Sequence, residues 1–420
     1  MLTDQHITVL HNEVTAIDRA AKTVTLADGR KLPYTKLYLA TGSSSFVPPI
    51  EGRDLQGVMT LRGLPDAERI REHLAAGKTR NIVFIGAGFI SMEAATLLAE
   101  QQSGAYTITI VELMDRPLPL MLDGDMSAVV RAYLEEKGLR FRTGEKVERI
   151  VGMDGRVTGV QLASGETLDA DMVFLNVGVR PNTQLAVDAG LEMAKFGIRV
   201  NTFQETSDPD ILAGGDCVEK CNFLTKKPAP GQLRGPAVVQ GRLAAKRLAG
   251  YDIEFPGVLD AGGCKMFDLT ITATGFTEDN AAREGFATVS AVVDSRSKHA
   301  MIPGVKPWKL KLVFDLASER LIGGQIVSHT VTMAREIDAV TAFILGGKTI
   351  RELTTFTSAC NPDISSEPSA EPITIAAEQA HSREESLADQ GVVARRDAEV
   401  AHAQALSAQA AARAARARAS

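Results

Sequence analysis

The chain has 420 residues, 45% of them hydrophobic and 23% charged, and its 46 basic and 52 acidic side chains leave a net charge of −6. This composition is typical of a globular protein with roughly two to three domains and excludes a disordered, fibrous or small disulfide-stapled chain. The weak and evenly spread charge gives no reason to expect nucleic acid or an anionic membrane as a partner.

Cysteine usage and the N-terminal sequence bear on the cellular compartment. Four cysteines are too few for a disulfide framework in a chain of this length and indicate reduced thiols. The first residues lack the basic and apolar regions of a signal peptide, and no apolar run reaches the roughly 18 residues that a spanning helix needs. We therefore expect a cytoplasmic protein without membrane association.

An internal repeat is the first organising feature along the chain. Residues 27–42 align without gaps on residues 163–178, and five of the aligned positions are identical. Alternating stretches at 13–17 and 146–150 precede the two copies and predict strands. Each copy is therefore expected to be a small β-meander that feeds a buried strand ending at glycine, and the chain contains two related units.

A strand, turn and helix pattern lies between the two copies. The apolar run 82–85 ends at a glycine turn, 86–88, and a helical stretch follows over 89–100. A second apolar strand over 106–111 ends in Glu112, which completes a βαβ unit. The same unit placed before the first repeat copy would precede residue 1, so we expect that the chain lacks roughly the first βαβ of one nucleotide-binding half.

The glycine turn is similar to a dinucleotide-binding fingerprint. Gly86 allows the tight turn and Gly88 lets the backbone approach a pyrophosphate, while Ser91, where a third glycine usually stands, is small enough for close helix packing. Glu112 is expected to hold the adenine-ribose hydroxyls and to repel a 2′-phosphate, which predicts NADH over NADPH. A nearby arginine, Arg116, can accommodate that phosphate and leaves the alternative open. A plain strand-to-helix turn is the other interpretation.

The remaining chain contains a further short strand and a separate domain. The segment 206–216 predicts a strand that ends on glycine and Asp216, and a helix is expected over 237–248. Strands are expected at 271–273 and 310–314 and a helix at 337–345, a pattern that predicts an α+β domain. The Ala- and Arg-rich residues 381–420 are interpreted as an exposed helix, a disordered tail or a non-native reading of the gene.

Four motifs, at 39–42, 86–93, 178–181 and 206–216, occur in the order found in two-dinucleotide flavoprotein oxidoreductases. Because of these four motifs and their order, the chain resembles the pyridine nucleotide-disulfide oxidoreductase superfamily. Two looser segments, 265–269 and 299–307, are similar to its branch of coenzyme A disulfide reductases, NADH oxidases and NADH peroxidases. The resemblance implies an α/β fold with two Rossmann-like domains, the first incomplete, and a C-terminal α+β dimerisation domain.

The resemblance also implies domain limits and a homodimer. We expect a partial FAD-binding domain at 1–61, an NAD-binding domain at 62–180 and the second part of the FAD-binding domain at 181–253. A dimerisation domain at 254–380 and a tail at 381–420 are expected to follow.

Cofactor-binding residues follow from the matched motifs. The resemblance implies that Thr41 and Gly42 pass near FAD, that Asp216 holds a ribityl hydroxyl, and that a helix starting at Pro236 points its N-terminus at the flavin ring. Without that context Asp216 would be interpreted as a turn cap. Phe89 and Glu93 would flank the nicotinamide, or be a core aromatic and a solvated carboxylate. The residues expected to bind the two cofactors are Gly86, Gly88, Phe89, Ile90, Glu93, Glu112, Gly178, Ala40, Thr41, Gly42, Asp216, Pro236 and Ala237.

The sequence departs from the family at its redox centre. The resemblance implies that the family's FAD fingerprint and active-site cysteine both lie in the N-terminal region that we expect this chain to lack. Cys217 and Cys221 lack redox CxxC spacing and metal-ligand neighbours and are expected to be structural thiols, as is Cys264 in a strand. Cys360 lies in the segment that in the family reaches the partner subunit's flavin, so it is either a redox residue or a loop thiol.

The function that the resemblance implies is NADH oxidation through FAD, with a disulfide, persulfide, quinone or oxygen as the small-molecule electron acceptor. No metal is expected. The alternative is a truncated, non-catalytic relative that binds NADH and dimerises without FAD. Because we expect the pyrophosphate-binding βαβ of this half to be lacking, we also expect FAD to bind weakly or not at all.

Overall fold

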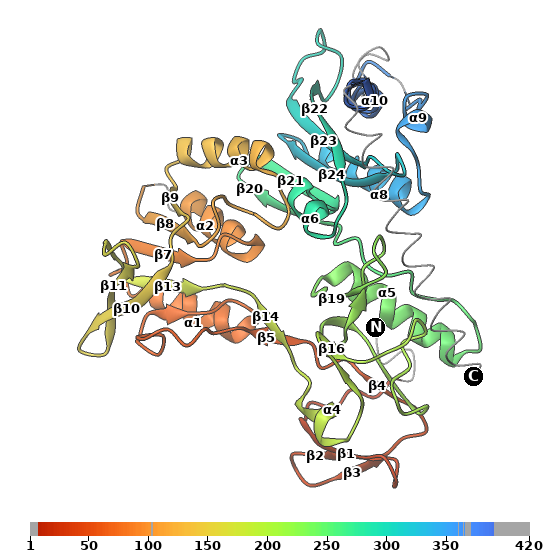
Figure 1. Ribbon diagram of the computed structural model, residues 1–420. Coiled ribbons are helices and arrows are strands. Elements are labelled where there is room, and N and C mark those ends of the chain that lie inside the picture. Colours follow the sequence, from red (N-terminus) through yellow and green to blue (C-terminus); the bar gives the residue numbers. More distant parts are fainter. Residues whose placement is uncertain (1–6, 102–103, 360, 364, 366–370, 390–420) are drawn as a thin grey trace, which may run out of the picture. The chain divides into compact units, whose positions relative to one another are not determined.

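The computed structural model describes residues 7–101, 104–359, 361–363, 365 and 371–389 (Figure 1). The chain divides into two compact units. Unit 1 consists of Met1–Gly86 and Val147–Gly262, and unit 2 of Ala87–Lys146 and Gly263–Ser420. Among the described residues, no helix has both the length and the apolar character to cross a membrane.

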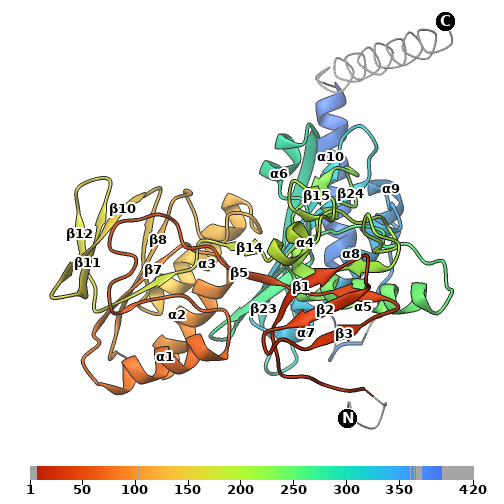
Figure 2. The ribbon, with the colours of Figure 1, turned by 90° about the horizontal axis from the view of Figure 1, so that it is seen from below.

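Both copies of the internal repeat fold into three-stranded antiparallel meanders, which confirms the prediction (Figures 1 and 2). The turn before the last strand of each meander places Gly29 and Gly165 at φ of +83° and +92°, a region that glycine adopts without strain. The strands are β1 (Val14–Asp18), β2 (Thr23–Leu26) and β3 (Lys31–Pro33) in the first copy and β10 (Val147–Met153), β11 (Arg156–Leu162) and β12 (Thr167–Asp169) in the second.

Parallel strands form the core of unit 1. The second meander leads into β13 (Met172–Leu175), which is buried throughout and pairs in parallel with β6 (Val58–Met59) and β7 (Asn81–Ile85). The rings of Phe84 and Phe174 stack with centroids 4.3 Å apart. The near-continuous apolar sequence of β7 and β13 is what a parallel sheet covered on both faces requires.

The first meander leads into β4 (Leu37–Leu39), which pairs in parallel with β17 (Ile211–Ala213). Leu39, Ile211 and Ala213 belong to one buried apolar cluster. The other elements of unit 1 are β5 (Ser43–Ser45), α1 (Leu64–Ala75), β14 (Val179–Pro181), α4 (Gln184–Asp188), β15 (Met193–Ala194), β16 (Gly197–Ile198), a 3-10 turn (Gly215–Cys217), β18 (Lys220–Cys221), β19 (Pro228–Ala229) and α5 (Arg234–Leu248).

Unit 2 begins with the rest of the predicted βαβ. Helix α2 (Phe89–Gln101) leads to β8 (Thr107–Glu112), then α3 (Gly124–Glu136) and β9 (Arg140–Thr143), which is parallel to β8. The helix and strand therefore lie within one or two residues of their predicted bounds.

The remainder of unit 2 is a five-stranded sheet with helices. Its strand order is β20 (Gly262–Met266), β21 (Leu269–Gly275), β24 (Leu321–Ser328), β23 (Pro307–Asp315) and β22 (Thr288–Arg296). Helix α8 (Ile337–Leu345) contacts β21 and β24, whereas α10 (Pro372–Asp389) contacts β22, β23 and α9 (Ile350–Leu353). Two short helices, α6 (Glu278–Arg283) and α7 (Val331–Ala334), complete it. The α/β class and the α+β C-terminal part are confirmed.

Candidate cofactor sites

The glycine turn between β7 and α2 has the backbone that close approach by a ligand requires. Gly86 has φ +94°, and a Cβ atom there would lie 2.6 Å from the backbone oxygen of Asn176, so any other residue would disrupt the strand pairing. At Gly88, no described heavy atom beyond its chain neighbours lies within 4 Å of the place of a Cβ. The turn is thus closed on the side of Gly86 and open at Gly88.

Glu112, at the end of β8, faces this turn. One carboxylate oxygen, Oε2, accepts a hydrogen bond from the backbone N–H of Ala87 at 2.7 Å, and Oε1 accepts one from Met114 at 2.9 Å. The fold therefore brings together the glycine turn and the acid that the sequence separates by 25 residues. A half-buried carboxylate in this place can accept hydrogen bonds from vicinal sugar hydroxyls and repels a further anion.

Helix α2 carries the other residues expected around a nicotinamide. Ser91 is fully buried, and its hydroxyl has no hydrogen-bond partner among the described residues. Its small size keeps the helix packed, but the hydroxyl is a cost that glycine would not have. Phe89 is half-buried and Ile90 is exposed at the start of the helix. Whether Phe89, Ile90 and Glu93 contact a nicotinamide stays a prediction.

Glu93 lies beside β20. Its Oε1 accepts a hydrogen bond from the backbone N–H of Lys265 at 3.2 Å. The neighbouring Cys264 is buried, and burial together with the charge of Glu93 raises the pKa of its thiol to about 12. Cys264 is therefore a neutral thiol at physiological pH, which agrees with the structural role expected for it.

Asp216, which was expected to hold a ribityl hydroxyl, stands in the 3-10 turn that follows β17. Its Oδ2 accepts hydrogen bonds from the hydroxyl of Ser43 and from Nη2 of Arg62, each at 2.7 Å, and its side chain is only 14% exposed. Arg62 also donates to Ser43 Oγ at 2.6 Å. The structure gives no partner to the other carboxylate oxygen among the described residues, so one oxygen is fixed and one is left to accept a polyol hydroxyl.

Three further side chains hold the turn that carries Asp216. The N–H of Gly215 donates to Gln240 of α5 at 2.9 Å, and the buried ammonium of Lys220 donates to the carbonyl of Gly215 at 2.7 Å. Burial lowers the pKa of Lys220. At Gly214 a Cβ would lie 2.1 Å from the hydroxyl of Tyr38, so β4 and the turn pack in contact.

Helix α5 begins earlier than the sequence predicts. Its first residue is Arg234, with Leu233 as N-cap, whereas the start was expected at Pro236 and Ala237. Proline fits the first turn because the N–H groups there have no acceptor within the helix. No described heavy atom beyond its neighbours lies within 4 Å of a Cβ at Gly235, so the helix end is accessible there.

Thr41 and Gly42 are tied to the strand that leaves the second repeat copy. The hydroxyl of Thr41 donates to the carbonyl of Asn182 at 2.6 Å, and the amide of Asn182 returns a bond to the carbonyl of Thr41 at 2.9 Å. The N–H of Asn182 donates to the carbonyl of Gly42. Ala40 is exposed beside them, and Gly178 has φ +123°.

The cysteines give no redox pair in the described part of the chain. Cys217 is buried, and its thiol donates to the carbonyl of Gly214 at 3.3 Å. Cys221 is half-buried, and neither is in a disulfide. The described residues contain no group of His, Cys, Asp and Glu that could hold a metal. Cys360, and residues 390–420 of the expected tail, lie outside the described residues.

Several contacts were not expected from the sequence. Arg62 and Ser43 at Asp216, and Gln240 and Lys220 at Gly215, stand in no motif, and the Arg62–Asp216 pair joins residues 154 positions apart. The burial of Lys220 could be predicted only if the residues around it were already known to belong to the core.

The chain is similar to known proteins over most of its length. The profile of the pyridine nucleotide-disulphide oxidoreductase family matches residues 2–240, and that of its dimerisation domain matches 262–371. The chain is 34% identical over 372 residues to an NADH oxidase of Methanocaldococcus jannaschii, covering 88% of this chain and 79% of the other. It is 32% identical over 345 residues to a CoA-dependent NAD(P)H sulfur oxidoreductase of Pyrococcus abyssi, covering 82% and 76%.

Two solved structures are similar over most of the chain. A NAD-dependent persulfide reductase from A. fulgidus has a TM-score of 0.86 at 34% identity and covers 92% of this chain and 71% of the other. A water-forming NADH oxidase from Lactobacillus brevis, bound to NADH, has a TM-score of 0.82 at 26% identity and covers 89% and 82%.

Proposed function

The chain belongs to the pyridine nucleotide-disulphide oxidoreductase family and is an enzyme of that type, and from this premise we propose that it oxidises NADH and passes the electrons through FAD to a small-molecule acceptor. The single observation that carries the nucleotide half is the hydrogen bond from the N–H of Ala87 to Glu112. It places an acid at the fingerprint turn, where the adenosine ribose of a dinucleotide binds in this kind of fold.

In the proposed reaction, the residues of this chain bind and orient. The N-terminus of α2 and the open backbone at Gly88 receive the pyrophosphate, because unpaired N–H groups at a helix start favour an anion. Glu112 accepts hydrogen bonds from the ribose hydroxyls and disfavours a 2′-phosphate. Phe89 and Glu93 flank the nicotinamide end.

The residues near Asp216 fit the ribityl and ring half of FAD. The free oxygen of Asp216 accepts a hydroxyl, while Arg62 and Ser43 fix the other oxygen and Arg62 offsets the charge of the carboxylate. The exposed start of α5 stabilises negative charge on the ring. When bound, FAD supplies the hydride-accepting chemistry that no side chain can.

The acceptor is proposed by class. Of the four similar proteins named above, two are NADH oxidases, one of them water-forming, and two act on sulfur compounds. A disulfide, persulfide, quinone or oxygen is therefore proposed for this chain. The match to the dimerisation domain supports a homodimer, with residues 254–380 as the proposed interface domain.

The test separates the nucleotide and flavin halves. NADH and NADPH are titrated into the purified protein by nucleotide fluorescence, and bound flavin is read from its absorbance. Glu112→Ala is expected to weaken NADH more than NADPH, whereas Glu100→Ala, an exposed carboxylate on α2, changes neither. Tighter binding of NADPH than NADH by the unmodified protein would refute the role of Glu112. NADH binding without flavin uptake would favour a non-catalytic nucleotide-binding relative over the flavoenzyme.

A further inference from the structure

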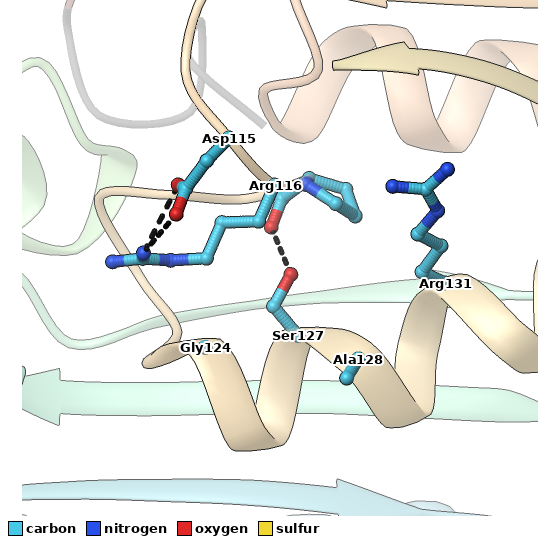
Figure 3. Close-up of a pocket in the computed structure, with 7 residues that line it drawn as sticks. Asp115, Arg116, Gly124, Ser127, Ala128 and Arg131 are labelled. Atoms are coloured by element: carbon cyan, nitrogen blue, oxygen red, sulfur yellow. Dashed lines mark hydrogen bonds and ion pairs between the residues drawn. The ribbon is translucent and has the colours of Figure 1, made fainter. Parts of the chain in front are cut away.

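The loop that follows Glu112 contains a cation whose role the sequence leaves open. Arg116 stands four residues after the ribose-binding acid, where an arginine could accept the 2′-phosphate of NADPH. In the structure its side chain is only 15% exposed. The guanidinium points away from Arg131, the other arginine around a pocket of about 190 Å³ beside α3 (Figure 3).

All three nitrogens of the Arg116 guanidinium are already engaged. Nε donates to the carbonyl of Leu122 at 3.2 Å, Nη1 donates to Asp115 at 3.0 Å, and Nη2 donates to Asp279. The pair with Asp115, drawn in Figure 3, joins neighbouring residues and uses a carboxylate that is 72% exposed. Asp279 comes from α6, 163 residues away, and is therefore the tertiary contact of the two.

Helix α6 contacts the same loop at two more places. The N–H of Glu278 donates to Asp123 Oδ1 at 2.9 Å, and the amide of Asn280 donates to the carbonyl of Leu120 at 3.3 Å. Three consecutive residues of α6 thus bind the loop between β8 and α3. The helix is itself capped by Thr277, whose hydroxyl accepts from the N–H of Asn280.

Buried polar contacts fix the end of the loop. The backbone N–H of Asp123 donates to Gln325 Oε1 at 2.8 Å, and the side-chain amide of Gln325 donates to Asp123 Oδ2 at 2.6 Å. Lys311, 3% exposed, lies 3.2 Å from the same carboxylate. Because buried ionic groups must keep their partners, the position of α6 relative to the loop is fixed before any nucleotide binds.

We propose that Asp279 is a specificity-determining residue for the dinucleotide, an inference that rests on the proposed function. By pairing with Arg116 it uses a donor and offsets the charge that a 2′-phosphate would need, and so leaves no free cation in the loop that follows Glu112. The selectivity of the nucleotide site is then set partly by a helix of the C-terminal region.

The test compares dissociation constants for NADH and NADPH, measured by nucleotide fluorescence. Asp279→Ala is expected to lower the ratio of the NADPH constant to the NADH constant by about tenfold, the size of one charge-assisted hydrogen bond gained by the phosphate. Asp279→Asn, which keeps an acceptor without the charge, is expected to lie between. Asp338→Ala removes a similar exposed carboxylate, paired with Arg335 at 3.0 Å on α8, and is expected to leave the ratio unchanged.

The double variant Asp279→Ala with Arg116→Ala decides the mechanism. The gain in NADPH affinity should disappear, because the released arginine is what binds the phosphate. A ratio in Asp279→Ala equal to that of the unmodified protein, or a gain that persists without Arg116, would overturn the proposal. Failure of the unmodified protein to bind either nucleotide would instead overturn the proposed function, and this inference with it.

Discussion

Lys311 offers the sharpest test of what holds unit 2 together. It lies on β23, is 3% exposed, and pairs with Asp123, Asp125 and Glu278 at 3.2, 3.0 and 2.5 Å. Lys311→Met keeps most of the side-chain volume but removes the cation. Asp123, buried to 5% exposure, then loses its charge partner. Removing one partner of a buried ion pair costs about 3–5 kcal/mol.

The lower end of that range applies here. Asp123 keeps two hydrogen bonds, from the N–H of Glu278 and from the amide of Gln325, and Asp125 and Glu278 can turn toward water. We therefore expect Lys311→Met to lower the free energy of unfolding by about 3 kcal/mol. Urea denaturation followed by the fluorescence of Trp308, a buried residue of the same strand, measures it.

Lys309→Met is the matched control. Lys309 is two residues away on β23 and pairs with Asp294, whose side chain is 81% exposed. A solvent-exposed pair contributes about 0–1 kcal/mol, so this variant should unfold nearly as the unmodified protein does. Equal losses in the two variants would refute the reasoning that burial makes the Lys311 pairs strong.

The pH dependence has a defined sign. Hydrogen bonding to Glu278 and Asp125 and the nearby charges outweigh burial and raise the pKa of Lys311 above its ordinary 10.5, so its contribution is complete below 10.5 and is lost as pH rises through the folded value. Burial raises the pKa of Asp123 above 3.8, and loss of Lys311 raises it further. The deficit of Lys311→Met should therefore shrink in mildly acidic buffer, because protonated Asp123 needs no cation.

Three further expectations follow from the packing and the family. Ser91→Ala removes a buried hydroxyl without a partner among the described residues and should raise the free energy of unfolding by up to about 1 kcal/mol in the same urea assay. Ser127→Ala loses a 2.6 Å hydrogen bond to the carbonyl of Pro117 and should lower the free energy of unfolding by a similar amount. Cys264, with a pKa of about 12, should resist alkylation in the folded protein near pH 8, and half-buried Cys221 should react before it. Mass spectrometry of the labelled peptides would contradict this if Cys264 were modified earlier than Cys221. Sedimentation should give a homodimer, and a stable monomer at micromolar concentration would contradict the proposed assembly.

The sequence predicts well what local periodicity and repetition encode. The two meanders, the strands around the glycine turn and helix 337–345 all follow from alternation, apolar runs and glycine positions. The approach of Glu112 to the turn is also predictable, because the carboxyl ends of neighbouring parallel strands meet at one edge of a sheet.

Long-range polar partners could not be predicted in the same way. The sequence allows Arg116 to be a ligand for a phosphate, and only the fold shows that its guanidinium already pairs with Asp279. Arg62 carries no periodic signal, yet it donates to Asp216. Such pairs depend on which loops the tertiary fold brings together, and these contacts between distant residues cannot be predicted from one sequence. The sequence predicts the start of α5 at Pro236 because proline favours the first helical position, but the helix begins at Arg234 since proline is also accepted later in the first turn.

The contact between Tyr38 and Gly214 has an evolutionary consequence. A methyl group added at Gly214 would lie 2.1 Å from the hydroxyl oxygen of Tyr38 and 3.1 Å from the ring carbon to which that oxygen is bonded. Replacement of Tyr38 by phenylalanine or a smaller residue is therefore expected to precede alanine at Gly214 during divergence, and Gln240, whose Cβ would lie 3.2 Å from the new methyl group, must also shift slightly. The reverse order would pass through a protein whose Asp216 turn is displaced.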